Sequence, residues 1–125
     1  MTNPTARRFE DLIAWQRAHQ LQSAIIEMTT RISHAEPALA DQLRRAARSV
    51  TANVAEGFER NTRGDFARFL AIAKGSAGEI RSHLYECHDA RLIPTPEFDE
   101  LKTQAEIVSA TIAKLRSAIQ DQRRS

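Results

Sequence analysis

Residues 39–60, "LADQLRRAARSVTANVAEGFER", carry two rows of side chains that repeat at spacings of three or four residues. The first row is apolar and consists of Leu39, Leu43, Ala47, Val50, Val54 and Phe58. Spacings of three and four place side chains on one face of an α-helix. This stretch therefore predicts an amphipathic helix, over about residues 37–59, that buries one face against other helices.

The second row in the same stretch is polar, and it runs beside the apolar one. Serine and asparagine weaken an isolated helix, so their presence favours side-chain bonding to a neighbouring helix or to another subunit. The segment "KGSAGEI", residues 74–80, offers a partner, because two glycines would allow close backbone approach and two polar side chains share a face. We call the expected contact the polar seam; its members are Gln42, Ser49, Asn53, Glu56, Gly57, Gly75, Ser76 and Glu79. A ligand or catalytic site built on Asn53, Glu56 and Glu79 is the alternative interpretation.

Three more helices are expected outward from this stretch, over about residues 9–31, 63–91 and 96–121, each with its own apolar row. The breaks between them carry helix-start signals. Pro37 suits a first helical turn, Thr62 suits an N-cap, and Thr95 suits an N-cap before Pro96. Short connections predict an antiparallel up-down-up-down four-helix bundle. We expect one all-α domain over residues 9–122, preceded by a flexible arm over residues 1–8.

Composition and charge narrow the class of protein. A single cysteine, Cys87, excludes an internal disulfide and fits a reducing cytoplasm. No apolar run approaches the roughly 20 residues of a membrane span, and the N-terminus lacks the apolar core of a signal peptide. We therefore expect a soluble cytoplasmic protein with no membrane partner. The net charge of +2 and a pI near 9.1 permit a nucleic-acid partner without requiring one.

Catalytic and metal chemistry find no support in the pattern of residues. A dinuclear metal site in a helical bundle needs Glu-x-x-His motifs, and none of the four histidines has a glutamate three residues before it. Cys87 and His88 are adjacent on a helix, so their side chains diverge by about 100° and cannot form a nucleophile–base pair. We predict no enzyme activity, no catalytic residue, no metal site and no cofactor.

Arginines cluster in and after the opening stretch. The candidate nucleic-acid-binding residues are Arg44, Arg45, Arg48, Arg60, Arg63 and Arg68. Arginine side chains neutralise phosphates, and a patch repeated around a symmetric assembly would multiply the charge density. The alternative is an ordinary solvated helix face.

Three segments together resemble one protein family: "FEDLIAWQRAHQL" (9–21), "LADQLRRAARSVTANVAEGFER" (39–60) and "FARFLAIAKGSAGEIRSHL" (66–84). They resemble the four-helix bundle proteins named after the 23S rRNA intervening sequence, to which the accessory protein of diversity-generating retroelements is similar. The chain departs from the family pattern at Thr51, where a proline is usual, and at Pro37, where an aromatic residue is common.

The resemblance implies an antiparallel four-helix bundle assembled as a homopentameric ring, with a basic surface that engages RNA or DNA. No catalytic activity is established for the family. Two functional hypotheses follow. The first is a non-enzymatic homo-oligomer that binds structured RNA. The second is a scaffold that docks a protein partner, such as the reverse transcriptase implied by the retroelement relative, without RNA specificity of its own.

Overall fold

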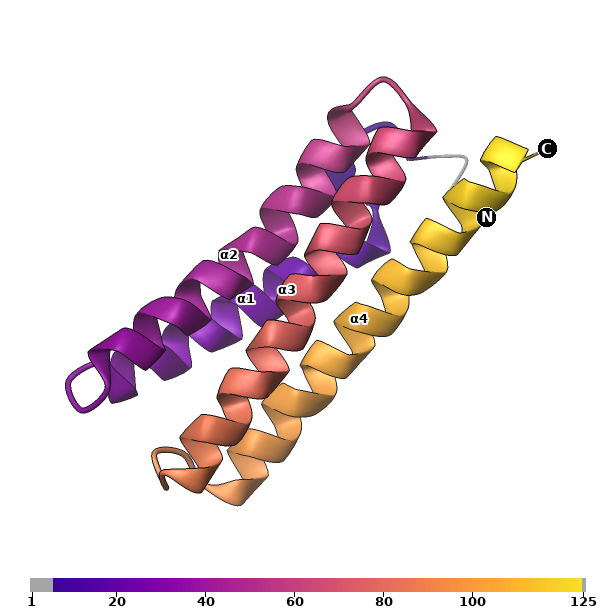
Figure 1. Cartoon of the computed structure of the whole chain (residues 1–125). Coiled ribbons are helices and arrows are strands. Elements are labelled where there is room, and N and C mark those ends of the chain that lie inside the picture. The colour runs from indigo at the N-terminus through magenta and orange to yellow at the C-terminus, as the bar shows by residue number, and fades with distance from the viewer. Residues whose placement is uncertain (1–5, 125) are drawn as a thin grey trace.

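The computed structural model describes residues 6–124, with side chains described as far as Asp121. It contains the helices α1 (Ile13–Ile32), α2 (Pro37–Glu59), α3 (Arg63–Asp89) and α4 (Thr95–Arg124), and a short 3₁₀ segment, η1 (Phe9–Asp11) (Figure 1). No strand occurs within residues 6–124. The prediction of an all-α protein with four helices is confirmed. Of the flexible arm predicted over residues 1–8, residues 1–5 lie outside the described part of the chain.

The four helices surround a common core. Over the described residues, the backbone of each helix lies close to that of the next one, and α1 also lies close to α4. The Cα atoms of the diagonal pairs α1–α3 and α2–α4 stay more than 8 Å apart over the same residues. The helices therefore stand at the corners of a square, with α1 diagonally opposite α3. The α1–α2 and α3–α4 loops lie at the lower end of the bundle in Figure 1, and the α2–α3 loop lies at the upper end. The contact between α1 and α4 is the least extensive of the four.

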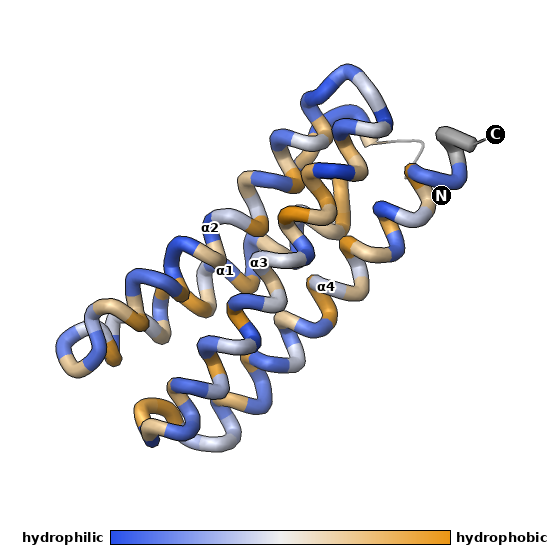
Figure 2. The backbone as a smooth tube through the Cα atoms, in the orientation of Figure 1, coloured by the Kyte–Doolittle hydropathy of each residue, from blue (hydrophilic) through white to orange (hydrophobic). Residues whose placement is uncertain are grey.

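The apolar rows supply the core. In Figure 2, hydrophobic segments on each helix alternate with hydrophilic ones, as expected for helices with one buried face. The largest side chains with almost no exposure come from all four helices and include Leu21, Ile25, Met28, Leu43, Leu70, Ile80, Leu84 and Ile112. Burial of each such side chain contributes about 1.5–3 kcal/mol to folding, so this shared core is what holds the helices together.

The first helix begins later than the predicted Phe9. The backbone N–H groups of Arg7 and Arg8 donate to the Asp11 carboxylate at 3.0 and 3.2 Å, and this contact accompanies the 3₁₀ turn η1. Leu12 is then extended (φ −76°, ψ 128°) and only 3% exposed, so its side chain enters the core before α1 begins at Ile13. The apolar row alone could not separate this tucked segment from a continuous helix.

The turn between α3 and α4 also differs from the expectation. Arg91 has a φ of 59°, and the N–H groups of Arg91 and Leu92 donate to the carbonyls of His88 and Cys87 at 3.0 and 2.9 Å. These two bonds form a Schellman motif, which ends α3 at Asp89. Thr95 is the first residue of α4 rather than its N-cap, and its hydroxyl lies 3.0 Å from His88 Nε2. The N-cap predicted at Thr62 is confirmed, because its side chain accepts from the backbone N–H of Asp65.

Candidate nucleic-acid interface

The middle of the polar seam joins α2 to α3. The Ser76 hydroxyl on α3 donates to the Ser49 hydroxyl on α2 at 2.8 Å. The Asn53 amide donates to the carbonyl and the hydroxyl of Ser49 at 2.8 and 3.0 Å. All three side chains are half-buried, so these bonds are shielded from much of the competition with water. This part of the seam has a structural role between two helices.

At Gly57, α2 and α3 approach each other closely. This residue is buried, and a Cβ added there would lie 2.9 Å from the Cβ of Phe69 and 3.0 Å from Cδ1 of Phe66. Real Cβ atoms essentially never come within 3.0 Å of such an atom, so the contact with Phe69 requires a shift of the neighbouring residues if residue 57 carries a side chain. Gly57 therefore sets the spacing of the two helices next to the α2–α3 loop.

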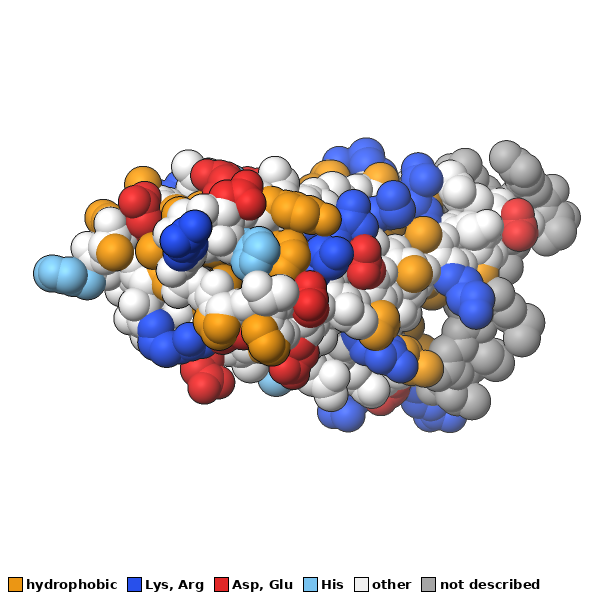
Figure 3. Space-filling model, turned by 90° about the horizontal axis from the view of Figure 1, so that it is seen from below, with side chains coloured by type: hydrophobic (Ala, Val, Ile, Leu, Met, Phe, Trp, Pro, Cys, Tyr) orange, Lys and Arg blue, Asp and Glu red, His pale blue; other side chains and the backbone are white. Residues whose placement is uncertain are grey.

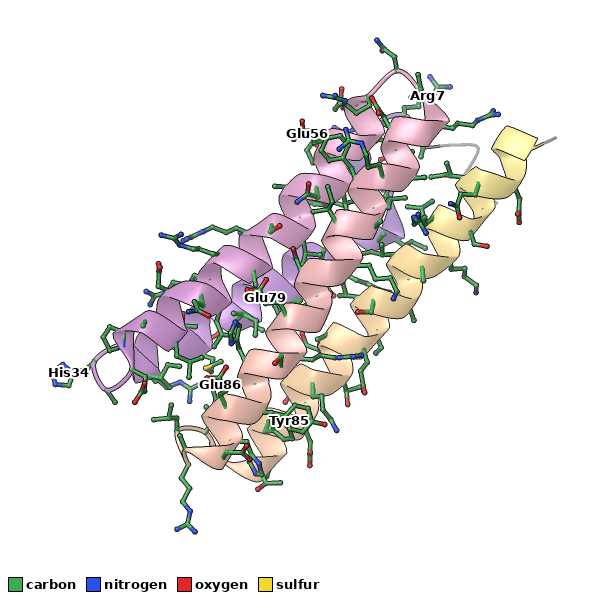
Figure 4. All side chains as sticks on the ribbon, viewed as in Figure 1. Arg7, His34, Glu56, Glu79, Tyr85 and Glu86 are labelled. Carbon is green, nitrogen blue, oxygen red and sulfur yellow. The ribbon has the colours of Figure 1, made fainter. Side chains whose placement is uncertain are left out.

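The rest of the seam faces solvent. Gln42, Glu56, Gly75 and Glu79 are exposed, and Glu56 pairs with Arg60 of its own segment at 3.5 Å rather than with α3. Figure 4 shows Glu56 on α2 and Glu79 further down the bundle on α3, well separated from each other. The row is wider than the helix contact, so only its inner members are covered.

The close helix approach expected at Gly75 and Gly78 is not made within the described part of the chain. Apart from the chain neighbours and the adjacent backbone of α3, a Cβ added at either position would meet no described atom within 4 Å. Glycine in the middle of a helix is about 1 kcal/mol less favourable than alanine, and no contact over residues 6–124 explains why these two positions carry it.

The predicted binding arginines fall into two groups, and we call the first, Arg44, Arg45 and Arg48, the basic row of α2. Arg44 is half-buried, and its Nε donates to the buried Thr29 hydroxyl of α1 at 2.8 Å. Arg45 pairs with Asp41 at 3.0 Å on the exposed surface. Arg48 is exposed and has no ion pair within the described residues. Over that same part of the chain, two of the three positive charges therefore lack a carboxylate partner.

The second group, Arg60, Arg63 and Arg68, lies at the α2–α3 loop and is more nearly neutralised. Arg60 and Arg68 both pair with Asp65, at 3.4 and 3.7 Å. Their guanidinium groups also lie over the ring of Phe69, at 5.1 and 4.6 Å from its centroid. Cationic and acidic side chains are also interspersed on the face of the molecule that Figure 3 shows from below.

Cys87 is placed unfavourably for a nucleophile, and His83 lies between two carboxylates of its own helix. Cys87 is fully buried, and burial raises the pKa of its thiol to about 11. His83 lies with Nδ1 2.8 Å from a Glu86 carboxylate oxygen and Nε2 3.5 Å from one of Glu79, all on one helix. Over residues 6–124, no group of three or more His, Cys, Asp or Glu side chains could hold a metal ion.

Two surface hollows were not predicted. One, of about 630 Å³, lies at the α3–α4 turn and includes His88, Arg91 and Thr95. The other is a groove of about 370 Å³ between α1 and α4, lined by Ile13, Arg17, Ala110, Thr111 and Lys114. The isoleucine at residue 13 lies outside the apolar row of its helix, and this was the signal in the sequence that could have pointed to the groove.

Comparison with known families connects this arrangement of helices to a named group. The family model described as "23S rRNA-intervening sequence protein" matches residues 10–114. The chain belongs to this family. The family predicted from the three segments quoted in the sequence analysis is thereby confirmed. No curated protein matches the chain.

The solved structure of another protein has a similar fold. A crystal structure of a protein with unknown function from the S23 ribosomal protein family of Bacteroides thetaiotaomicron is similar, with a TM-score of 0.79 and 16% identity. The match covers 84% of this chain and 96% of that one. At this identity the likeness concerns the fold alone. Over the described residues, none of the helices is long and apolar enough to cross a membrane.

Proposed function

We propose that this chain is a non-enzymatic, homo-oligomeric helical bundle that binds nucleic acid, structured RNA above all, through the basic row of α2. The observation that carries the proposal is the charge balance of this row. Three arginines stand within five residues of exposed or half-buried helix surface, and among the described residues only Arg45 of the three is paired with a carboxylate. Arg48 is both exposed and without a carboxylate partner among the described residues. Such a guanidinium group is suited to replace a counterion of a phosphate backbone.

Assembly supports this function because the charge of one chain is modest. A net charge of +2 gives weak attraction to nucleic acid for a monomer. We propose that the subunit is an antiparallel up-down-up-down bundle that forms a homopentameric ring in the cytoplasm. A ring repeats the basic row once per subunit, so several phosphates could be contacted at once and their contributions would multiply.

The bonds of the polar seam support a role without catalysis. Ser49, Asn53 and Ser76 bond to one another, and Glu56 pairs with Arg60. Asn53 and Glu56 are two of the three groups that the alternative of a catalytic site would use, and both make contacts within the fold.

The test is binding of a short RNA hairpin, measured by fluorescence anisotropy over a series of salt concentrations. Arg45→Ala with Arg48→Ala should weaken binding and reduce the slope of log K against log salt by about 0.7–0.9 for each phosphate that is no longer neutralised. Arg44 is left in place because it bonds to Thr29 and its removal could disturb the fold.

Two controls separate charge from position. Arg45→Lys with Arg48→Lys keeps the charge and should retain most of the affinity. Arg81→Ala with Arg91→Ala removes two cations from other parts of α3 and its C-terminal turn, and should change binding less. Equal losses from the two alanine pairs, or no binding at low salt, would contradict the proposal.

A second function is favoured by exposed apolar side chains. Ile13, Ile72, Tyr85 and Ile107 are each 41–58% exposed, which suits contact with protein more than with phosphate. A scaffold that docks a protein such as a reverse transcriptase would use them. Recovery of a specific protein with the tagged chain after nuclease treatment, and no recovery of RNA, would favour this function over the first.

A further inference from the structure

The groove between α1 and α4 presents apolar surface that the described part of the chain leaves uncovered. Ile13 at its edge is 58% exposed. Ile107 is 41% exposed and stands one helical turn before the groove residues Ala110 and Thr111 on α4. Arg17 also lines the groove and has no ion pair over residues 6–124. The groove thus combines exposed isoleucines with an unpaired positive charge.

A second uncovered surface lies on the opposite corner of the bundle. A row of exposed α3 residues repeats at alternating spacings of three and four, which is the pattern of a helix face that packs against another helix. We call it the outer row of α3; its members are Ile72, Gly75, Glu79, Ser82 and Glu86. Its upper part is apolar or small, with Ile72 42% exposed, and its lower part is acidic. Arg68, one turn above Ile72, is already paired with Asp65.

We propose that the α1–α4 groove binds the outer row of α3 from a second copy of this chain. The two surfaces are complementary in charge, because the groove is basic at Arg17 and the outer row is acidic at Glu79. They are complementary in character too, since each carries exposed isoleucine. The inference rests on the proposed homo-oligomer and adds to it the surfaces that meet.

The arrangement of the helices makes this contact a head-to-tail one. Because α1 and α3 stand at diagonally opposite corners of the bundle, the groove and the outer row face in different directions on one subunit. A contact between two different patches is heterologous, and repeated copies of it close into a ring when the rotation allows. An isologous dimer would need one patch that contacts itself.

The two surfaces also lie at the same height along the bundle. Gly75 stands about 14 residues before the end of α3, Arg17 about 15 residues before the end of α1, and Ala110 about 15 residues after the start of α4. At about 1.5 Å per residue, each lies about 22 Å from the lower end. Neighbouring subunits could therefore stand side by side without a shift along their axes.

The proposed contact explains why the outer row of α3 contains a glycine, Gly75. Apart from its chain neighbours and the adjacent backbone of α3, no described atom lies within 4 Å of a Cβ added at Gly75, so packing within the subunit does not require glycine there. A helix from a neighbouring subunit could approach the bare backbone at Gly75 more closely than at any larger residue.

The experiment compares masses in solution, by light scattering after size-exclusion chromatography, for two variants. The groove variant carries Ile13→Glu with Ile107→Glu, and the outer-row variant carries Gly75→Leu with Glu79→Lys. Each variant alone should run as a single chain of 14.1 kDa, while the wild type runs as an oligomer. An equimolar mixture should form a dimer of twice that mass, because each variant retains one intact surface.

Matched controls test position and folding. Ala52→Leu with Glu59→Lys makes similar changes at exposed positions of α2 and should leave the oligomer intact. Circular dichroism checks that each variant is helical. If a variant fails to fold, the milder Ile13→Gln with Ile107→Gln, or Gly75→Gln with Glu79→Gln, replaces it.

The outcomes distinguish the assignment of the two surfaces from the existence of the homo-oligomer itself. Variants that remain oligomeric like the wild type overturn the assignment of surfaces but leave the homo-oligomer standing, as does a mixture that yields no dimer. A wild-type chain that runs as a monomer overturns the second copy as the occupant, and the groove would then be open to a different protein. Binding of the RNA hairpin by the monomeric variants reports separately on the basic row.

Discussion

At the scale of single residues, the glycines show that one residue type can have opposite effects on stability at different positions of one helical bundle. Gly57 is surrounded by Phe66 and Phe69, and a Cβ there would overlap them. A Cβ added at Gly78 has no described atom within 4 Å other than its chain neighbours and the adjacent backbone of α3. The first is required by packing, while the second weakens its helix without any benefit inside the subunit.

The glycine pair yields opposite changes in stability when each is replaced by alanine. Gly57→Ala should lower the free energy of unfolding by about 1–3 kcal/mol, because the added methyl group overpacks the α2–α3 contact. Gly78→Ala should raise it by about 0.5–1 kcal/mol through helix propensity. Urea unfolding followed by circular dichroism measures both, and each variant is the control for the other. Changes of the same sign would contradict this account.

The sequence identified these glycines as unusual but could not tell them apart. The difference depends on how closely neighbouring helices approach each position, and that distance is set by side chains far away in the chain. The same holds for Arg44, whose bond to Thr29 joins residues from two helices and leaves no trace in local spacing.

At the scale of elements, periodicity predicted the helices well and their ends less well. Apolar rows of 20 or more residues leave little doubt about helix type. The ends depend on local competitors, such as the Asp11 carboxylate before α1 and the Schellman motif after Asp89. Such competitors act through one or two hydrogen bonds, which a row of apolar residues does not reveal.

The hydrogen bond between Ser49 and Ser76 should couple α2 to α3. In a double-mutant cycle with Ser49→Ala and Ser76→Ala, we expect a coupling free energy of about 0.5–1.5 kcal/mol, typical of a partly shielded neutral hydrogen bond. Urea unfolding of the four proteins provides the cycle. The exposed Ser23→Ala, combined with either change, is the control and should be additive. Additivity of the Ser49 and Ser76 changes would show that the bond is not formed.

The η1 segment should be sensitive to acid. The backbone N–H groups of Arg7 and Arg8 donate to Asp11 and lower its pKa below the ordinary value. A carboxyl group with a lowered folded-state pKa stabilises the fold above its unfolded pKa of about 3.9, and this contribution disappears as the pH falls through the folded-state pKa.

The variant Asp11→Asn isolates this effect. The difference in urea midpoint between wild type and Asp11→Asn should be present at pH 7 and vanish toward pH 2. The exposed Asp99→Asn on α4 serves as the control for loss of one negative charge. A difference that stays constant down to pH 2 would argue against the carboxylate as the cause.

At the scale of the whole molecule, the family and the bundle could be predicted, whereas the candidate site could be predicted only as a set of residues. All six candidate arginines were proposed from the sequence alone. Their division into the basic row of α2 and the neutralised group at the α2–α3 loop could not be predicted. It depends on Asp65 pairing with both Arg60 and Arg68, which the fold brings together. The α1–α4 groove was missed because it belongs to two helices at opposite ends of the chain.

Cys87 should report the opening of the whole bundle. Its thiol is fully buried and has a pKa raised to about 11, so at pH 8 it is neither accessible nor ionised in the folded state. Labelling by a thiol reagent should therefore be slower than in 8 M urea by a factor of about 10³ or more, comparable to the unfolding equilibrium of a stable domain. A free cysteine introduced at the exposed Ser23, in a Cys87→Ala background, is the control and should react at once. Rapid labelling of folded wild type would mean that the core opens locally.

The tight approach at Gly57 has a consequence for how this family can diverge. The side chains of Phe66 and Phe69 fill the space beside Gly57 between the two helices, and no room is left there for a side chain at residue 57. A relative with alanine or serine at the position of Gly57 can keep the helix spacing only by carrying a smaller residue opposite it. Evolution should therefore treat these positions as a correlated set, so that they change together or not at all when sequences of relatives are aligned.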